Sequence, residues 1–230
     1  FAGGANTAAT ARSVDFDGTG DYLQPASSSD FTMGTGDFTV ECWVKPDNIS
    51  NKGIFQVSSA GLNSSQGECS VSVNSSGIWK SWIDGTGYDH SIQATRGAWT
   101  HLALVRNSGK TRLYVDGIPS ADVTHTTNMT GDTIDIGGYY NTSYLHDGLI
   151  SNFRVVKGTA VYTSSFRPPT EPLTNITNTK LLCCNNSSTT GSTVTPGTIT
   201  ANGDPTASTD SPFDDPAAFK FGDNKEGIIK

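Results

Sequence analysis

The chain has 230 residues, 16% of them charged, and a formal net charge of −7 at pH 7. Lysine and arginine form no cluster, which excludes nucleic acid as a partner because phosphate binding needs concentrated basic groups. No stretch approaches the roughly 20 apolar residues that a membrane helix requires, so no membrane span is expected, and the many Ser, Thr, Gly and Asn residues indicate an extracellular surface.

Short runs with β-forming residues recur along the chain between clusters of Gly, Asn, Asp and Pro. In chain order they are RSVDFDG (12–18), DFTVECWVKP (37–46), GIFQVSS (53–59), CSVSVN (69–74), IWKSWID (78–84), WTHLALVRN (99–107), TRLYVDG (111–117), DTIDIGG (132–138), LISNFRVV (149–156) and TKLLCC (179–184). Such spacing is typical of an all-β sandwich or jelly roll. An apolar period of 3.6 residues never persists for ten residues, so almost no helix is expected.

The strongest turn signal lies between the runs 99–107 and 111–117. Residues 107–110 form a polar tip, Asn-Ser-Gly-Lys, between two apolar stretches, and this pattern predicts a hairpin. Later in the chain, Gly158 suits a turn, and Pro168 followed by Pro169 cannot continue a regular ladder. The strand that begins near Leu149 is therefore expected to end before these residues.

The sequence contains four cysteines. Cys42 and Cys69 alternate with apolar residues, so both are expected on core faces as thiols, and a disulfide between them is the alternative. Cys183 and Cys184 are adjacent and would point to opposite faces of a strand, so they could bond each other only with strain. No CxxC spacing of a zinc site is present.

Several of these runs, in their order, resemble a known superfamily. SVDFDGTGDYL, DFTVECWVKP, WTHLALVRNSGKTRLYVDG, IGGYY and DGLISNFRVVKGTAVY are together similar to laminin-G-like domains of the concanavalin A-like lectin and glucanase superfamily. The resemblance covers residues 12–184 and implies an all-β, two-sheet antiparallel jelly-roll sandwich. The segments VVKGTAVYTSSFRPPTEPL and NTKLLCC look like domains of structural proteins of tailed, particularly marine, bacteriophages.

In such a sandwich, Leu149 to Val156 would be the last long strand. The segment YTSSFRPP would then be a strap that leaves the sheet and is anchored by Tyr162 and Phe166, and a short return strand at Thr179 to Leu182 would complete the domain.

The expected domain organisation has three parts. Residues 1–11 form an N-terminal extension, 12–184 the sandwich, and 185–230 a low-complexity linker with the start of a further β segment in FKFGDNKEGIIK (219–230). This tail is expected to pack on its own domain or on a neighbouring subunit, and we predict docking on other copies or on virion proteins.

Enzyme activity is not expected. A glucanase needs two carboxylates that flank the glycosidic bond, but Asp132 and Asp135 are unsuitably spaced in DTIDIGG and the glutamates at 41, 68, 171 and 226 are scattered. The histidines at 90, 101, 125 and 146 have no adjacent nucleophile elbow.

No cofactor is expected either. Asp15, Asp17, Thr19 and Asp21 occupy positions of an EF-hand-like calcium loop, but position 12 is Ala26 instead of a glutamate, so a solvated turn is the favoured interpretation. Relatives often hold calcium through an acidic residue in the closing strand, where this chain has Ser151 and Asn152. A calcium ion at the rim near Asp147 remains the alternative.

Two predicted loops carry the mixture of aromatic and polar residues that carbohydrate sites use. The first offers Trp82, Asp84, Tyr88 and His90, and the second offers Tyr139, Tyr140, Asn141, Tyr144 and His146. They form either a glycan-binding rim or a covering of the sandwich edge or a subunit interface. The tryptophans at 43, 79 and 99 lie within or beside strands and are assigned to packing.

The sequence thus favours a non-enzymatic structural and glycan- or receptor-recognition module of a phage virion appendage or surface decoration, located on the virion surface or outside the cell. A secreted bacterial or environmental adhesin is the alternative, and a polysaccharide hydrolase is disfavoured.

Overall fold

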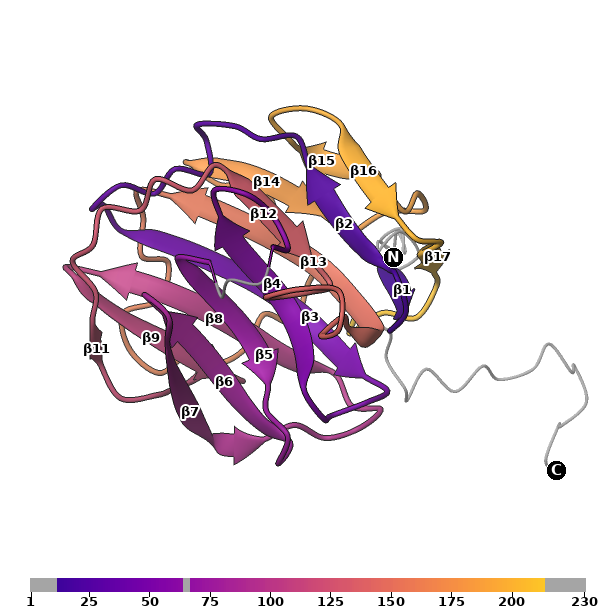
Figure 1. Cartoon of the computed structure of the whole chain (residues 1–230), viewed down its shortest axis with the longest axis horizontal. Helices are drawn as coiled ribbons and strands as arrows, with labels where there is room; N and C mark the ends of the chain where they lie inside the picture. Colours follow the sequence, from indigo (N-terminus) through magenta and orange to yellow (C-terminus); the bar gives the residue numbers. More distant parts are fainter. Residues whose placement is uncertain (1–11, 64–66, 214–230) are drawn as a thin grey trace, which may run out of the picture.

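The computed structural model describes residues 12–63 and 67–213, and these form 17 β-strands. The predicted fold class is confirmed: two antiparallel sheets pack as a jelly-roll sandwich, with no helix among the described residues (Figure 1). In particular, this part of the chain contains no helix of the length and apolar character needed to cross a membrane.

The larger sheet has ten strands. Its main path runs through β10 (Ile118–Pro119), β9 (Lys110–Val115), β8 (Thr100–Asn107), β3 (Phe38–Pro46), β13 (Asp147–Lys157), β1 (Ser13–Asp17) and β17 (Thr206–Ser208). Three further strands join it at the sides: β11 (Val123–Thr124) on β9, β14 (Thr179–Cys183) on β13, and β15 (Ser192–Val194) on β14.

The smaller sheet has seven strands in the order β16 (Ile199–Asn202), β2 (Tyr22–Pro25), β12 (Thr133–Ile136), β4 (Lys52–Ser58), β5 (Cys69–Val73), β6 (Ile78–Ile83) and β7 (Thr86–Gln93). The alternating apolar residues of both sheets point inward and form one core, because successive side chains of a strand point to opposite faces. Trp79 is fully buried in this core, which confirms its assignment to packing.

The predicted hairpin is present between β8 and β9. Its two turn residues, Ser108 and Gly109, have positive φ angles of 51° and 75°, the backbone conformation of the two-residue turns that match strand twist.

The strand β13 ends in a strap, as expected. Residues 158–178 leave the sheet, and Tyr162 and Phe166 stack on each other with ring centroids 3.6 Å apart. Both rings cover the outer face of the larger sheet at Ala103, Val105 and Tyr114. The strap keeps this apolar patch out of water and returns the chain to β14.

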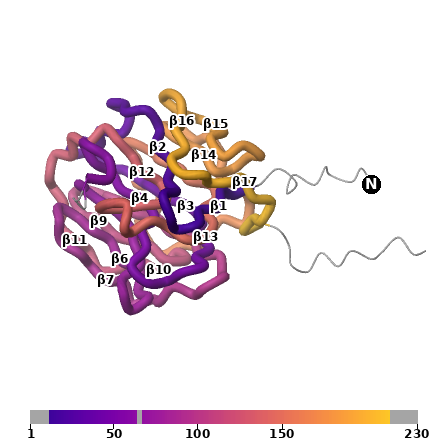
Figure 2. The backbone as a smooth tube through the Cα atoms, turned by 45° about the vertical axis from the view of Figure 1, so that its right-hand side comes forward, coloured from indigo at the N-terminus to yellow at the C-terminus, as the bar shows by residue number. Residues whose placement is uncertain are grey.

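The tail differs from the predicted linker. Residues 192–208 contribute β15, β16 and β17, so the tail adds strands to both sheets of its own chain and lies beside β1 and β2 (Figure 1 and Figure 2). Main-chain ladders explain this, because an edge strand can be held by backbone hydrogen bonds although its side chains are polar. The segments 1–11 and 219–230, named above as extension and β segment, lie outside the described residues.

Two tryptophans help to hold the end of this tail. The Trp99 indole N–H donates to Asp210 over 3.1 Å, and Trp43 contacts the ring of Phe213 at a centroid distance of 5.8 Å. The tail is thus fixed by side chains as well as by strand pairing.

The cysteines are all free and buried. The expectation that Cys183 and Cys184 point to opposite faces is wrong: their Sγ atoms lie 3.8 Å apart inside the core. The reason is that Cys184 follows the end of β14 and has a φ of +55°, which turns its side chain back toward that of Cys183.

Candidate functional site

The outer face of the smaller sheet carries a row of aligned residues from five neighbouring strands. Asp135, Gln56, Ser70, Trp82 and Gly87 stand opposite one another in successive antiparallel pairs. Residues directly opposite in such pairs share one face of the sheet. The row is therefore polar from Asp135 to Ser70, and at its other end the indole of Trp82 lies beside Gly87.

Two loops cover this row and meet at Gln56. The Gln56 side chain donates to the carbonyl of Gly61 over 3.0 Å and accepts from the backbone N–H of Tyr140 over 2.7 Å. Gln56 is fully buried, and a buried amide of this kind fixes both loops because leaving it unpaired would cost about 1–3 kcal/mol. Gln56 was not among the predicted site residues, because the sequence around it has no distinguishing local pattern.

The second loop, residues 137–146, carries three tyrosines that contact one another, and one of them, Tyr139, contacts Trp82. Tyr139 is stacked on the indole with a centroid distance of 6.1 Å and an interplanar angle of 27°. Tyr144 lies 5.3 Å from Tyr139 and 5.8 Å from Tyr140. We call Trp82, Tyr139, Tyr140 and Tyr144 the aromatic cluster. Tyr139 is buried, whereas the other three rings are half-buried, so the cluster presents aromatic surface to solvent.

Tyr140 has an unusual backbone conformation, with a φ of +66°. Left-handed backbone is rare for a bulky residue and carries a strain of about 1–3 kcal/mol. The hydrogen bond from its N–H to Gln56 holds the residue there. Strained residues of this kind are concentrated at binding sites.

A cation lies next to the cluster. The Lys80 ammonium is 4.6 Å from the centroid of the Trp82 ring and 3.4 Å from a carboxylate oxygen of Asp89. Gly87 makes room for this pair, because a Cβ there would overlap the Lys80 side chain and contact the indole. The cluster therefore has hydrogen-bond donors and acceptors at its edge. Lys80 was not among the predicted site residues, although its position two residues before Trp82 on one strand places both side chains on one face.

The remaining predicted residues lie elsewhere. The exposed Asp84, in the β6–β7 turn, accepts from the Thr127 hydroxyl over 2.5 Å. Tyr88 is 37% exposed but stands opposite Ser81, so it points to the other face of the sheet from Trp82. Asn141 lies in the tyrosine loop, where its side chain accepts from the N–H of Ser143.

The two predicted histidines are inside the protein and not at its rim. His90 is 4% exposed and its ring bonds the carbonyl of Ile118, and burial lowers its pKa. His146 is fully buried against Phe16, and burial lowers its pKa to about 3. Both rings are therefore buried side chains of the sandwich, and the sequence did not indicate this because histidine is intermediate between typical core and typical surface residues.

The other end of the polar row contains a buried acid. Burial raises the pKa of Asp135 to about 6, and the hydrogen bond from the Gln24 amide, at 2.8 Å, only partly opposes this. Asp135 is covered by the loop at Gly61, where a Cβ would already contact its carboxylate. This acid is not accessible to a glycosidic bond.

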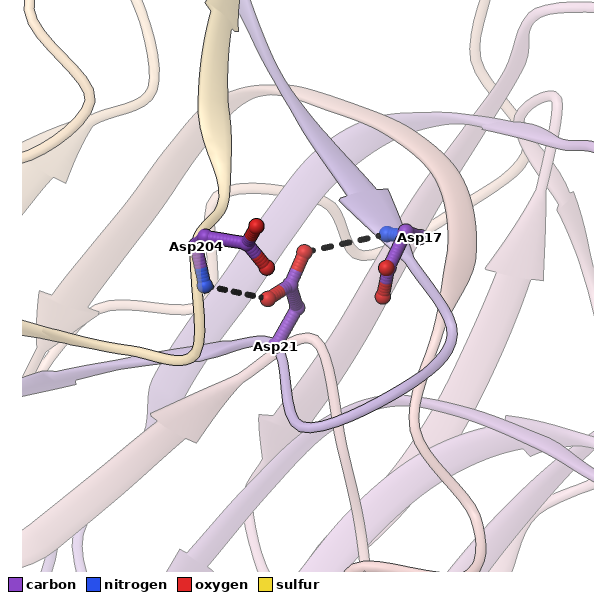
Figure 3. A group of neighbouring side chains, drawn as sticks. All are labelled: Asp17, Asp21 and Asp204. Atoms are coloured by element: carbon purple, nitrogen blue, oxygen red, sulfur yellow. Dashed lines mark hydrogen bonds between the residues drawn. The ribbon is translucent and has the colours of Figure 1, made fainter.

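A separate acidic cluster lies where the first turn meets the tail. Carboxylate oxygens of Asp17, Asp21 and Asp204 lie within 4.8 Å of one another (Figure 3). Asp204 was missed, because it lies 183 residues from Asp21 in sequence. Asp15, which the calcium-loop pattern included, instead pairs with Leu149 and Thr206 in the larger sheet.

The buried member of this cluster, Asp21, has hydrogen-bond donors for both of its carboxylate oxygens. The two carboxylate oxygens of Asp21 accept from the backbone N–H groups of Asp17 and Asp204, over 3.1 and 2.8 Å (Figure 3). Asp21 therefore links the β1–β2 turn to the β16–β17 turn through these two hydrogen bonds. Asp147 stands opposite Asp17 in the β1–β13 pair, and the calcium ion near it stays a prediction.

Comparisons with known proteins agree with this architecture. The family model described as "Concanavalin A-like lectin/glucanases superfamily" matches residues 17–161. No curated protein matches the chain in sequence.

Two solved structures share the fold. A heptameric SAP-like pentraxin from Limulus polyphemus is 16% identical, with a TM-score of 0.62 over 91% of this chain and 99% of the pentraxin. A putative carbohydrate binding protein from Bacteroides ovatus is 17% identical, with a TM-score of 0.62 over 86% of this chain. The chain spans 59% of the length of that second protein.

Proposed function

Because the chain belongs to the concanavalin A-like lectin/glucanase superfamily, we propose that it is a non-enzymatic glycan-recognition module that binds saccharides at the aromatic cluster. The observation that carries the proposal is the meeting of Trp82 with the tyrosine loop on the outer face of the smaller sheet. Sugar rings present apolar C–H faces that pack on aromatic rings, while their hydroxyls need donors and acceptors at the edge.

The cluster supplies both kinds of contact. The half-buried rings of Tyr140 and Tyr144 offer faces or edges for stacking, and the Lys80–Asp89 pair offers charged hydrogen-bonding groups nearby. The fixed loop supports the proposal further, because a preorganised site loses less conformational entropy on binding. Expected affinities are those of shallow saccharide sites, in the millimolar to micromolar range, or about −4 to −8 kcal/mol.

The experiment is a glycan array followed by calorimetric titration of the best glycan, with Tyr140→Ala and Tyr144→Ala. Each removed ring should weaken binding by about tenfold or more, since one aromatic side chain contributes about 1–3 kcal/mol. Tyr88→Ala is the matched control, because Tyr88 is exposed on the other face of the sheet. Melting temperatures distinguish a lost contact from a lost fold.

Unchanged binding in both cluster variants would remove the aromatic cluster from the site. If instead these variants lose stability together with self-association, the cluster would be an interface between subunits. Release of reducing sugars from any bound polysaccharide would contradict the non-enzymatic part of the proposal.

We further propose that this recognition serves a phage virion, as an appendage or a surface decoration. The support is the resemblance of residues 155–173 and 178–184 to structural proteins of tailed phages, and the alternative remains a secreted adhesin. Soluble chain added in excess should slow adsorption of the phage to its host by competing for the same glycan. Adsorption that is unaffected at saturating chain would contradict the virion role while leaving glycan binding intact.

A further inference from the structure

A cavity of about 220 Å³ lies on the outer face of the larger sheet, on the opposite side of the sandwich from the aromatic cluster. The β8–β9 hairpin, the segment before β11 and the strap surround it. Its lining includes two cations, one carboxylate, two tyrosines and several uncharged polar residues, among them Lys110, Arg112, Asp122, Tyr162, Asn107 and Thr163.

The charge of this cavity is opposite to that of the chain. Lys110 and Arg112 lie two residues apart on β9, so both point to one face. They share a single carboxylate: the Lys110 ammonium lies 3.1 Å from Asp122, and the Arg112 Nε contacts its other oxygen. Two cations with one anion leave a net charge of +1 in a chain whose net charge is −7.

The side chain of Arg112 is held in place by protein contacts, while some of its N–H donors remain available to a ligand. One terminal N–H group of Arg112 donates to the Thr163 carbonyl over 3.3 Å, and its Nε–H donates to Asp122. A guanidinium has five N–H donors, so even with Tyr114 beside it at least two donors remain for a ligand. Arg112 and Asp122 are each about one third exposed, so the ion pair is open to solvent and to exchange with another anion.

The strap gives this cavity a fixed wall. Tyr162 lines the cavity and donates its hydroxyl hydrogen to the fully buried Glu41 over 2.8 Å. Its ring is stacked on Phe166. The cavity is therefore formed before any ligand arrives, which is the usual state of small-molecule sites.

From this geometry we propose that the cavity binds one acidic saccharide unit, with Arg112 and Lys110 contacting its carboxylate or sulfate group. Charge-assisted hydrogen bonds from Arg and Lys are the strong contacts to such groups, and Asn107 and Thr163 offer partners for the hydroxyls. The volume is below the roughly 300–1,000 Å³ of drug-sized sites, which fits one sugar unit and not a longer chain. The proposal rests on the proposed function only in taking the ligand to be a saccharide.

The test is titration of the whole chain at low salt with methyl β-D-glucuronide, glucose 6-sulfate and neutral methyl β-D-glucoside. Both acidic sugars, or one of them, should bind at least about tenfold more tightly than the neutral one, and the comparison between them identifies the anionic group. Arg112→Gln should weaken acidic-sugar binding about tenfold or more, the scale of one hydrogen bond to a charged group. Arg96→Gln is the matched control, because Arg96 is exposed and precedes the opposite end of β8.

A second variant should change the affinity for the acidic sugar in the opposite direction. Asp122→Asn removes the competing carboxylate, so the acidic sugar should bind more tightly and the salt dependence should become steeper. If Arg112→Gln fails to fold, Lys110→Gln and Asp122→Asn decide the question, because the Lys110 side chain is 60% exposed.

Equal binding of the acidic and neutral sugars, or binding unchanged in Arg112→Gln, would overturn this inference and leave the aromatic cluster untouched. Acidic sugars that bind in the cavity while no glycan binding responds to Tyr140→Ala would support the inference and contradict the proposed function. The two failures are thus distinguishable.

Discussion

The substitution Glu41→Gln tests whether a buried charge network holds the strap on the larger sheet. Glu41 is fully buried and accepts hydrogen bonds from Arg154 at 2.9 and 2.6 Å, from Tyr162 at 2.8 Å and from the His101 ring at 3.1 Å. Burial alone would raise the pKa of Glu41, but the hydrogen bond and charge of His101, followed by those of Arg154, outweigh it and lower the pKa. The carboxylate is therefore ionised in the fold.

Glutamine keeps the shape of the side chain but removes its charge. The Arg154 guanidinium, with a side chain only 6% exposed, is then left without a counterion, and one carboxylate oxygen becomes an NH₂ group that faces the donors of Tyr162 and His101. Breaking a buried ion pair on one side costs about 3–5 kcal/mol. For a chain of this size 1 kcal/mol corresponds to about 2–4 °C, so the melting temperature should fall by about 6–20 °C.

The assay is thermal and urea unfolding, both followed by tryptophan fluorescence, with limited proteolysis of the strap as a second readout. The double variant Glu41→Gln with Arg154→Met is the control, because it removes both charges and should recover much of the loss. A loss below about 1 kcal/mol for Glu41→Gln, or a double variant no better than the sum of its single variants, would refute the network as the anchor. Wild-type stability should also fall at acid pH, since a lowered carboxyl pKa contributes stability that is lost as pH falls through it.

Further predictions concern buried acids, histidines, close backbone contacts and thiols. Asp135→Asn should raise the unfolding free energy at pH 7 by roughly 2–3 kcal/mol, because a pKa raised to about 6 makes the ionised fold less stable as pH rises from about 4 to 6; denaturant curves across this range check the slope. His146→Phe should remove a stability loss that wild type shows as pH falls from about 6.5 to 3, because the buried ring stays neutral down to a pKa of about 3; equal acid sensitivity of both proteins would contradict this. Gly117→Ala should cost about 2–4 kcal/mol by thermal unfolding, since its φ is +76° and a Cβ there would overlap the carbonyl of Phe166. All four cysteines are free and buried, so they should react with a thiol reagent only after unfolding, and rapid labelling of the native protein would argue against this packing.

The sandwich itself could be predicted because its strands alternate. Leu149 to Val156 was expected as the last long strand, and β13 spans Asp147–Lys157. The double proline at 168–169 indicated where the ladder stops, and the aromatic pair indicated how the strap is held. These features are encoded locally, so a single sequence contains them.

The tail strands, the candidate site and the buried histidines depend on contacts between residues that are far apart in the sequence. The serine- and threonine-rich tail has the composition of a linker, but β17 and β16 form because β1 and β2 offer edges for backbone pairing, and β15 pairs with β14. The candidate site was predicted as two loops, but Trp82 lies in a strand and approaches the tyrosine loop only because β6 is aligned with β5 and β4. Histidine at 90 and at 146 had no local signal that distinguished a core position from a rim position.

The pairing of β1 affects how the chain folds during synthesis. The hydroxyl of Ser13 donates to the carbonyl of Asp210, 197 residues later, and β1 lies between β13 and β17. At about 5–20 residues per second on the ribosome, the first strand waits roughly 10–40 seconds for its second neighbour. Both of its edges are unpaired until β13 is made, and the edge that β17 covers stays unpaired until the tail is made, so that edge is open longest to pairing with another chain.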